Sequence, residues 1–298
     1  MAAGRHAGFK AAAGQYILFV DADDALAPQT CERLLAEMRE QPTDVLDFGL
    51  FLVPDPQSPP TQEAMAGLQR QFSFPEKDFP SADTLTLLRA MIAEHTISWN
   101  AHHKLYRRAL LAEAYTAYHD EYVNMWEDLL LSFLVMCRAG SYRVIGDRLY
   151  RYTVGSGMST QDGPIGTDRM RAMLRDYSHV SRLLEADIAT QPEALRPALE
   201  ALLTQAQRQM SGRILNCLCR RCAAEQCREL LPALRDCFPY ELFADFTVTY
   251  MNEHMRETQE CLRQSQAYAR GLEASPSYRI GRAVTALPRR LRGILGKK

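Results

Sequence analysis

The sequence predicts an α/β fold class in which a sheet-containing region is followed by a mostly helical region. Residues 15–21 (QYILFVD) form a short, almost wholly apolar run, the pattern of a strand buried on both faces. Residues 44–53 (DVLDFGLFLV) predict a second strand that ends at Pro54. From residue 168 to about residue 271 the pattern is helical almost throughout.

Further elements are expected between these landmarks. Apolar spacing and flanking residues predict helices over residues 28–40, 81–94 and 126–139, the second of them capped by Ser81. Residues 54–80 hold six prolines and little periodicity, which favours a surface loop. Residues 141–152 alternate as one or two strands do, and a glycine-bearing loop over 155–166 follows.

The composition is that of an ordinary folded protein with a lopsided end. Of 298 residues 47% are hydrophobic and 24% charged, which excludes wholesale disorder. The 35 basic and 36 acidic residues give a net charge of −1, so the composition does not indicate a nucleic-acid binder. Residues 279–298 contain seven Lys or Arg and no acid, which leaves −8 for the rest.

That basic end predicts a membrane-seeking tail. Over residues 278–298, apolar side chains recur every three to four positions with arginines between them, as in an amphipathic helix that lies on an anionic membrane surface. A solvated terminus is the alternative. We therefore expect three parts: an α/β region over 1–160, a helical region over 161–270 and a basic amphipathic tail over 271–298.

No membrane span or export signal is visible in the sequence. The longest apolar run, residues 129–137, is far shorter than the roughly 20 residues that a spanning helix needs. We therefore expect a cytoplasmic protein with reduced thiols, peripheral on the inner face of the cell membrane if the tail binds there. The cysteines at 217, 219, 222 and 227 fall within a continuous predicted helix over 214–231, where cysteine serves as small apolar filler and not as a metal ligand.

Three carboxylates follow the first predicted strand, at Asp21, Asp23 and Asp24. They repel one another unless a cation offsets their charge, and the carboxyl end of a strand is where α/β folds bind ligands. Hard oxygen ligands suit Mg²⁺ or Mn²⁺, and such an ion can carry a diphosphate. The alternative is that the acids only cap the next helix.

The surrounding residues resemble glycosyltransferases of family 2 with the GT-A fold. Residues 4–24 (GRHAGFKAAAGQYILFVDADD) are similar to the family's helix and strand that end in a metal-binding Asp-x-Asp. Two later segments agree in the same order: Trp99 and Asn100 followed by KLYRR from Lys104, with three residues interposed, and MWEDL over 125–129, with Trp126 where Gly is usual. The resemblance covers residues 4–160. The closing SxSYRxGR over 275–282 also resembles the tail of bacterial members.

The resemblance implies a partial GT-A (Rossmann-like) sheet and assigns roles to individual residues. Asp21 and Asp23 would hold Mn²⁺ or Mg²⁺ against a nucleotide-diphospho-sugar, and Arg5 would face the nucleotide. Asp128, with Glu127 beside it, would be the general base that deprotonates a hydroxyl of a glycan or lipid-linked acceptor. The product would be inverted at the sugar carbon, in the synthesis of a cell-surface polysaccharide or glycoconjugate.

On the acceptor side, the resemblance points to three residues, Trp99, Asn100 and Lys104. His102 and His103 could bind phosphate or metal, although adjacent histidines in a loop are more often simply exposed.

The chain also departs from the family pattern. His6 stands where Asn is common, and the two N-terminal strands that bind the nucleotide base and ribose have no counterpart, so we expect a transferase that lacks its front. Two alternatives follow: a truncated, non-catalytic remnant that acts as a binding protein, and an aspartyl-phosphate phosphatase that uses Asp21 and Asp23.

Overall fold

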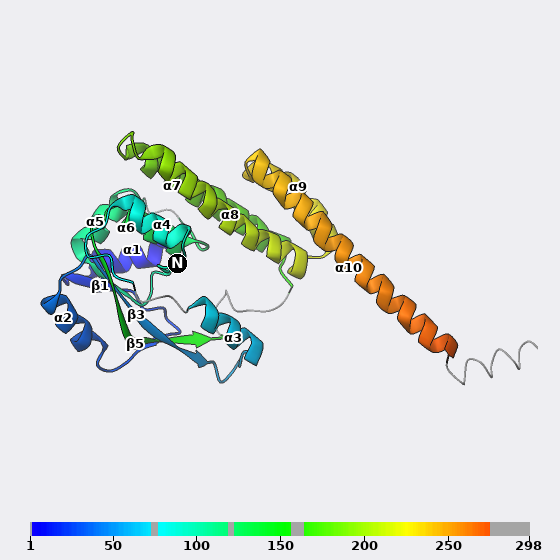
Figure 1. Cartoon of the computed structure of the whole chain (residues 1–298), viewed down its shortest axis with the longest axis horizontal. Coiled ribbons are helices and arrows are strands. Elements are labelled where there is room, and N and C mark those ends of the chain that lie inside the picture. Colours follow the sequence, from blue (N-terminus) through cyan, green and yellow to red (C-terminus); the bar gives the residue numbers. More distant parts are fainter. Residues whose placement is uncertain (1, 73–76, 119–121, 156–163, 275–298) are drawn as a thin grey trace, which may run out of the picture. The chain divides into compact units, whose positions relative to one another are not determined.

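The computed structural model describes residues 2–72, 77–118, 122–155 and 164–274, which divide into two compact units, 1–243 and 244–298. The first unit contains a mixed sheet with helices packed on it (Figure 1). The α/β fold class predicted from the sequence is confirmed. The sheet has five strands in the order β1-β4-β3-β5-β2: β1 (Tyr16–Leu18), β2 (Ala25–Leu26), β3 (Val45–Pro54), β4 (Lys104–Arg107) and β5 (Tyr142–Val154).

The longest strand pair of this sheet is parallel. β3 and β5 run side by side from Val45 opposite Tyr142 to Pro54 opposite Val154, whereas the other neighbouring strands are antiparallel. β3 is the strand predicted from residues 44–53, and β5 joins the residues predicted as one or two strands into a single one. Strand β1 differs from the prediction: Ile17 and Phe19 are buried, but Val20 is 44% exposed, because β1 lies at an edge of the sheet.

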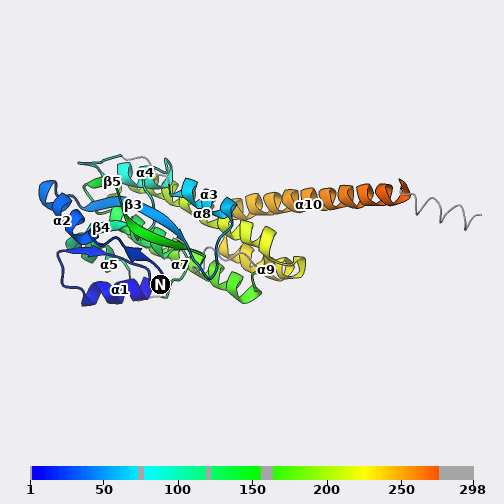
Figure 2. The same ribbon diagram turned by 90° about the horizontal axis from the view of Figure 1, so that it is seen from below.

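Six helices precede the helical region. Their bounds are α1 (Ala2–Ala11), α2 (Thr30–Glu40), α3 (Gln62–Gln71), α4 (Thr84–Ile92), α5 (Arg108–Thr116) and α6 (Glu127–Met136). Helix α2 covers one part of the sheet, where Leu34 and Met38 pack against Leu46, Phe48 and Tyr150. Burial of such side chains contributes about 1.5–3 kcal/mol each. Figure 2 shows α1 and α5 beside the sheet, near the strand ends that carry the acidic turn.

Two local predictions in this region were wrong. Residues 54–80 are not all loop, because Thr61 accepts a hydrogen bond from the backbone of Ala64 (3.1 Å) and caps helix α3. The N-cap of helix α4 lies two residues after the predicted one, since Asp83 and not Ser81 accepts from the backbone of Thr86 (2.7 Å). Both caps are polar side chains whose choice depends on where the chain turns, which periodicity does not fix.

Long helices follow, as the sequence predicted: α7 (Thr167–Thr190), α8 (Arg196–Arg221), α9 (Ala224–Cys237) and α10 (Tyr240–Ala274). Helix α7 packs against α6, α8 and α9, so the helical region is built directly onto the α/β region within the first unit. Helix α10 continues into the second unit. None of the helices in the described ranges is both long enough and apolar enough to cross a bilayer. The tail predicted over 278–298 lies outside the described residues.

The cysteine-bearing helix is interrupted, contrary to the prediction. Helix α8 ends at Arg221, Cys222 is extended, and the side chain of Gln226 accepts a hydrogen bond from the backbone of Ala223 (2.8 Å) to start α9. Among the described residues no set of three or more His, Cys, Asp or Glu is placed to hold a metal ion. Burial raises the pKa of Cys222 to about 11, so this sulfur is a thiol at neutral pH.

Candidate active site

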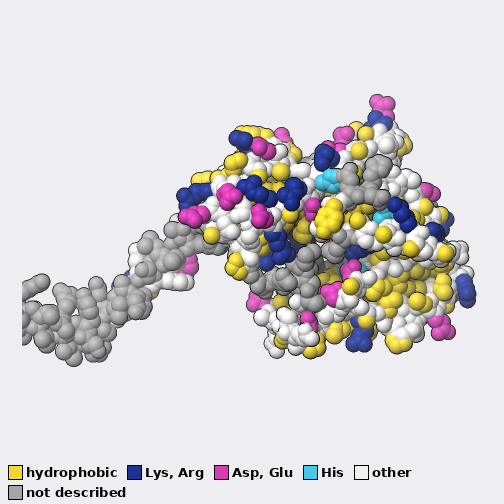
Figure 3. Space-filling model, turned by 180° about the vertical axis from the view of Figure 1, so that it is seen from behind, with side chains coloured by type: hydrophobic (Ala, Val, Ile, Leu, Met, Phe, Trp, Pro, Cys, Tyr) yellow, Lys and Arg dark blue, Asp and Glu magenta, His cyan; other side chains and the backbone are white. Residues whose placement is uncertain are grey.

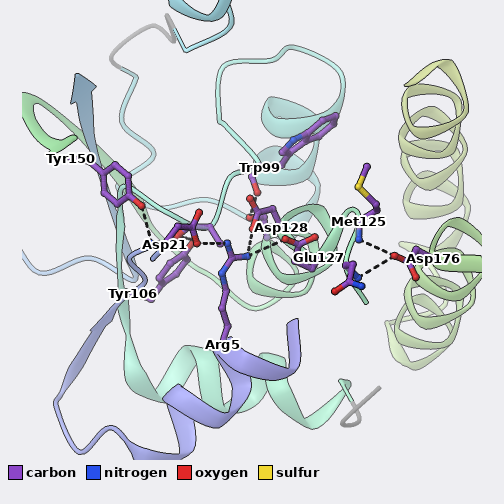
Figure 4. A network of polar contacts seen from close by, with 12 residues as sticks. Arg5, Asp21, Trp99, Tyr106, Met125, Glu127, Asp128, Tyr150 and Asp176 are labelled. Carbon is purple, nitrogen blue, oxygen red and sulfur yellow. Dashed lines mark hydrogen bonds and ion pairs between the residues drawn. The ribbon is translucent and has the colours of Figure 1, made fainter. Parts of the chain in front are cut away.

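Arg5 lies at the centre of the candidate site, in the first turn of α1 (Figure 4). Its guanidinium is 3.1 Å from Asp21 Oδ1, forms a hydrogen-bonded ion pair with Asp128, and lies 3.8 Å from Glu127 Oε1. Burial disfavours the charge, but the carboxylates of Asp128, Asp21 and Glu127 outweigh it and raise the pKa of Arg5. One buried cation therefore joins the acidic turn after β1 to the acids at the start of α6.

The acids of α6 follow a left-handed residue. Trp126 has φ 62°, a conformation that costs a residue with a side chain about 1–2 kcal/mol and that glycine adopts freely. This conformation explains the glycine expected at this position from the family resemblance. It turns the chain so that Glu127 and Asp128 begin α6 and face Arg5 (Figure 4). Their charges also interact favourably with the positive end of the helix dipole.

Glu127 and Asp128 lie in different environments. The Glu127 side chain is 7% exposed and the Asp128 side chain 23%. Burial, together with the neighbouring Asp128 charge, raises the pKa of Glu127 to about 8 despite the nearby Arg5. Glu127 therefore carries a proton near neutral pH, whereas Asp128 is the ion-pair partner of Arg5 and the more accessible carboxylate.

The acidic turn is held by strand β5. The hydroxyl of Tyr150 accepts from the backbone of Asp21 (3.1 Å) and donates to Asp24 Oδ2 (2.7 Å). Thr153 donates its backbone N–H to Asp24 Oδ1 (2.7 Å) and its hydroxyl to the carbonyl of Asp23 (2.6 Å). Burial, which these hydrogen bonds only partly offset, raises the pKa of Asp24 to about 6. Asp24 therefore anchors the turn, and Asp21 and Asp23 remain the candidates for a ligand.

Tyr150 and Thr153 were missed by the sequence analysis. Both lie about 130 positions from the acidic turn along the chain, and no local pattern relates an alternating strand to a distant turn. Thr153 lies just beyond the strand predicted over 141–152, whereas β5 extends to Val154 and includes it.

The two histidines correct another expectation. His102 and His103 are each 4% exposed and are therefore core residues. His102 stacks on Tyr150 with ring centroids 5.0 Å apart, and His103 Nδ1 lies 2.8 Å from Asp47 Oδ1. Burial lowers the pKa of both rings, so they are neutral at physiological pH. Their place beneath Tyr150 supports the acidic turn.

The residues predicted for the acceptor side differ in how deeply they are buried. Lys104 is fully buried: its Nζ donates to the carbonyl of Asn100 (2.7 Å) and lies 3.6 Å from Asp47 Oδ2. Burial favours neutral Asp47, but the charge of Lys104 and the hydrogen bonds with His103 and Tyr142 outweigh it and lower its pKa to about 2. The carbonyl of Trp99 accepts from Ser132 of α6 (2.7 Å), which holds residue 99 near the acids (Figure 4). Trp99 and Asn100 are half-buried.

Asp21 and Asp23 fit the way proteins hold Mg²⁺ or Mn²⁺ at a phosphate. Such sites use one or two carboxylates and complete the coordination with water and substrate phosphate oxygens, so no third protein ligand is required. Asp23 is exposed and the side chain of Asp21 is 29% exposed. The metal assignment remains a prediction for these two residues.

Comparison with known proteins identifies the family of the part of the chain that carries Arg5 and the acidic turn. Residues 1–110 match the family model described as "Glycosyl transferase family 2". This part of the chain belongs to glycosyltransferase family 2. The prediction of a family-2 glycosyltransferase with an α/β fold is thereby confirmed. Among curated proteins, none matches this chain.

Solved structures show a similar fold for most of the chain. Three structures of Staphylococcus aureus TarS 1-349 are similar to it: with UDP-GlcNAc (19% identity, TM-score 0.51), with UDP (21%, 0.52) and without either (18%, 0.53). Each match covers 88% of this chain and 70 or 71% of TarS 1-349.

Proposed function

We propose that this family-2 chain transfers a sugar from a nucleotide-diphospho-sugar to a hydroxyl group of an acceptor, with inversion at the anomeric carbon. The observation that carries the proposal is the contact of Arg5 with both Asp21 and Asp128. It brings the candidate donor site and the candidate base, 107 positions apart in sequence, to one place. Binding of UDP-GlcNAc by the similar fold of TarS supports a nucleotide-sugar donor.

In the proposed reaction, Asp21 and Asp23 would hold Mn²⁺ or Mg²⁺, and such an ion would supply positive charge that stabilises a leaving diphosphate. Asp128 accepts the proton of the acceptor hydroxyl, whose oxygen forms the new bond to the anomeric carbon from the side opposite the departing diphosphate oxygen. The protonated Glu127 leaves Asp128 as the basic member of the pair, since unlike environments separate the pKa values of two neighbouring acids.

Donor binding tests the first half of this proposal. Titration of UDP-GlcNAc into the full chain with Mn²⁺ should give binding that is lost on chelation and weakened about tenfold or more in Asp23→Ala. Glu32→Ala, which removes an exposed acid from the neighbouring helix α2, is the matched control and should bind as the wild type does. Equal binding by Asp23→Ala and the wild type, with or without metal, would contradict the metal site.

We further propose that the acceptor is a glycan or a lipid-linked saccharide of a cell-surface pathway, reached at the inner face of the cell membrane. The support is the basic amphipathic pattern of residues 278–298. Each basic residue near an anionic membrane contributes about 1 kcal/mol of attraction, which salt screens. In a sedimentation assay, phosphatidylserine vesicles should therefore bind the full chain at low salt and release it at high salt. A chain that ends at Ala274 should not bind to the vesicles. No binding at low salt would exclude the membrane role.

A further inference from the structure

A polar groove lies between α7 and the segment that precedes α6. Its volume is about 470 Å³, and its walls include Tyr122 and Asn124 on one side and Arg175, Asp176 and Arg182 on the other. All of these residues belong to the first unit. None was assigned a function from the sequence. Figure 3 shows basic side chains grouped over the helical region on one face of the molecule.

Two arginines give the groove its chemical character. Arg175 and Arg182 are exposed and seven positions apart on α7, which places them on the same helix face two turns apart. Within the described ranges Arg175 has no carboxylate partner, and Arg182 contacts only the ring of His179 (3.2 Å). Guanidinium groups bind carboxylate, sulfate and phosphate oxygens through paired hydrogen bonds. The groove therefore favours an anionic ligand.

An aromatic side chain stands at the rim of the groove. Tyr122 is 75% exposed, which is unusual for so large a ring and exceeds the exposure of Tyr118 and Trp126 nearby in the sequence. A tyrosine ring offers an apolar face for the C–H groups of a sugar and a hydroxyl for its polar edge. Together with the arginines, it suits a saccharide that carries anionic groups.

The groove is connected to the candidate base through the backbone. Asp176 Oδ2 accepts hydrogen bonds from the backbone N–H groups of Asn124 (3.1 Å) and Met125 (2.9 Å) (Figure 4). The carboxylate keeps its negative charge in these bonds, but among the described residues it forms no ion pair with either arginine, and the two arginines outnumber it in the groove. Asn124 lies four positions before Asp128, and four residues span at most about 14 Å. A short saccharide in the groove can therefore extend to the base.

We propose that this groove binds an anionic saccharide and is the acceptor site of the enzyme. The acceptor role rests on the proposed function, because a transferase needs a hydroxyl-bearing ligand next to its base. The binding of an anionic saccharide does not depend on it. Asp176 acts as a positioning residue, since it fixes both the groove wall and the segment that leads into Glu127 and Asp128.

Binding of a charged saccharide by the full chain tests this proposal. Calorimetric titration with a short dextran sulfate oligomer near physiological salt should show binding that neutral dextran of the same length does not match. Arg175→Ala/Arg182→Ala should weaken it about tenfold or more, because two charge-assisted contacts are lost. Arg213→Ala/Arg228→Ala, which removes two exposed arginines of α8 and α9, is the control of equal charge and should bind as the wild type does.

Several outcomes would contradict the proposal that the groove binds an anionic saccharide. Equal weakening in the groove and control variants would mean that only net charge matters. A single-stranded DNA oligomer that binds as tightly, with the same loss in the groove variant, would exclude a saccharide-specific site. Hydrolysis of UDP-GlcNAc is measured in parallel: absence of probe binding with intact hydrolysis overturns the groove alone, whereas absence of hydrolysis in the wild type contradicts the transferase and, with it, the acceptor role.

Discussion

At the scale of single residues, the site consists of Arg5 and the three acidic side chains that surround it. The side chains of Arg5 and Glu127 are 11% and 7% exposed, so little solvent is available to compensate for an unpaired charge. Removal of one member of such a buried set exposes the others to uncompensated repulsion. The arrangement therefore stabilises the fold and at the same time holds the acids of the candidate site in place.

Replacement of Arg5 tests this balance. Arg5→Ala should lower the free energy of unfolding by about 3 kcal/mol, because the carboxylates of Asp21 and Asp128 lose their common cation. Arg33→Ala is the control, since the Arg33 side chain is 41% exposed and its pairs with Glu37 and Asp147 should contribute at most about 1 kcal/mol. Urea unfolding measures both. Similar losses in the two variants would show that Arg5 is an ordinary surface cation.

Glu127 should make stability depend on pH. Its pKa is raised from 4.5 to about 8 in the folded chain, so the folded state keeps a proton that the unfolded state has lost between these values. Stability should therefore fall as pH rises through this window, by at most about 1.4 kcal/mol per pH unit. The interval from pH 7 to 8 lies above the raised pKa of Asp24, about 6, and above the range of the buried histidines.

The variant Glu127→Gln isolates this effect. The amide cannot ionise, so the free energy of unfolding of this variant should change less between pH 7 and 8 than that of the wild type. Urea unfolding at the two pH values provides the comparison. An equal slope in both proteins would mean that Glu127 ionises normally in the folded chain.

How much of the site the sequence can predict depends on the range of the contacts involved. Arg5, Asp21, Glu127 and Asp128 were identified from motifs, and the structure brings all four together. Asp47 was missed, although it compensates Lys104 and His103, because an aspartate within an apolar strand has no signature until its partners fold around it. Asp176 was missed for the same reason, since its partners are backbone N–H groups more than 50 positions away.

At the scale of secondary structure elements, α6 depends on the residue before it. Trp126 is 7% exposed and its ring packs edge-on against Tyr177 of α7, with centroids 6.5 Å apart. The backbone conformation favours glycine, whereas the packing favours a large ring. The packing of the Trp126 ring against the helical region therefore offsets the strain of its backbone conformation.

Two substitutions separate the strain from the packing. Trp126→Gly and Trp126→Ala both remove the ring and should lower stability by about 3 kcal/mol or more. The glycine variant should nevertheless be more stable than the alanine variant by about 1 kcal/mol, because glycine adopts the positive φ without penalty. Thermal or urea unfolding compares them. An alanine variant at least as stable as the glycine variant would contradict the left-handed conformation.

The elements that the sequence predicted well are those with a strong repeating pattern. Strands β3 and β5 were predicted close to their observed bounds, and the four long helices fall in the region that was predicted to be helical. Helix α3 and the break between α8 and α9 were not, because a single capping side chain decides each of them. The order of the strands could not be predicted from the sequence either: β3 and β5 are neighbours although their first paired residues, Val45 and Tyr142, are 97 positions apart.

At the scale of the whole molecule, the helical region and the α/β region form one compact unit over residues 1–243. The predicted boundary at residue 160 marks a change of secondary structure, and α7 nevertheless packs directly on α6. The hydrogen bonds of Asp176 show why this matters for function, since a residue of the helical region positions the chain next to the candidate base. The proposed reaction thus requires both regions.

Hydrolysis of a nucleotide-sugar tests the central claim most directly. Water can replace the acceptor, so the full chain with Mn²⁺ should release UDP from UDP-GlcNAc slowly, and chelation should abolish the release. Asp128→Asn should reduce the rate by about a hundredfold or more, because the general base is lost, while donor binding persists. Asp23→Ala should abolish both. If the wild type and both variants release UDP at the same rate at every metal concentration, the proposed active site is wrong.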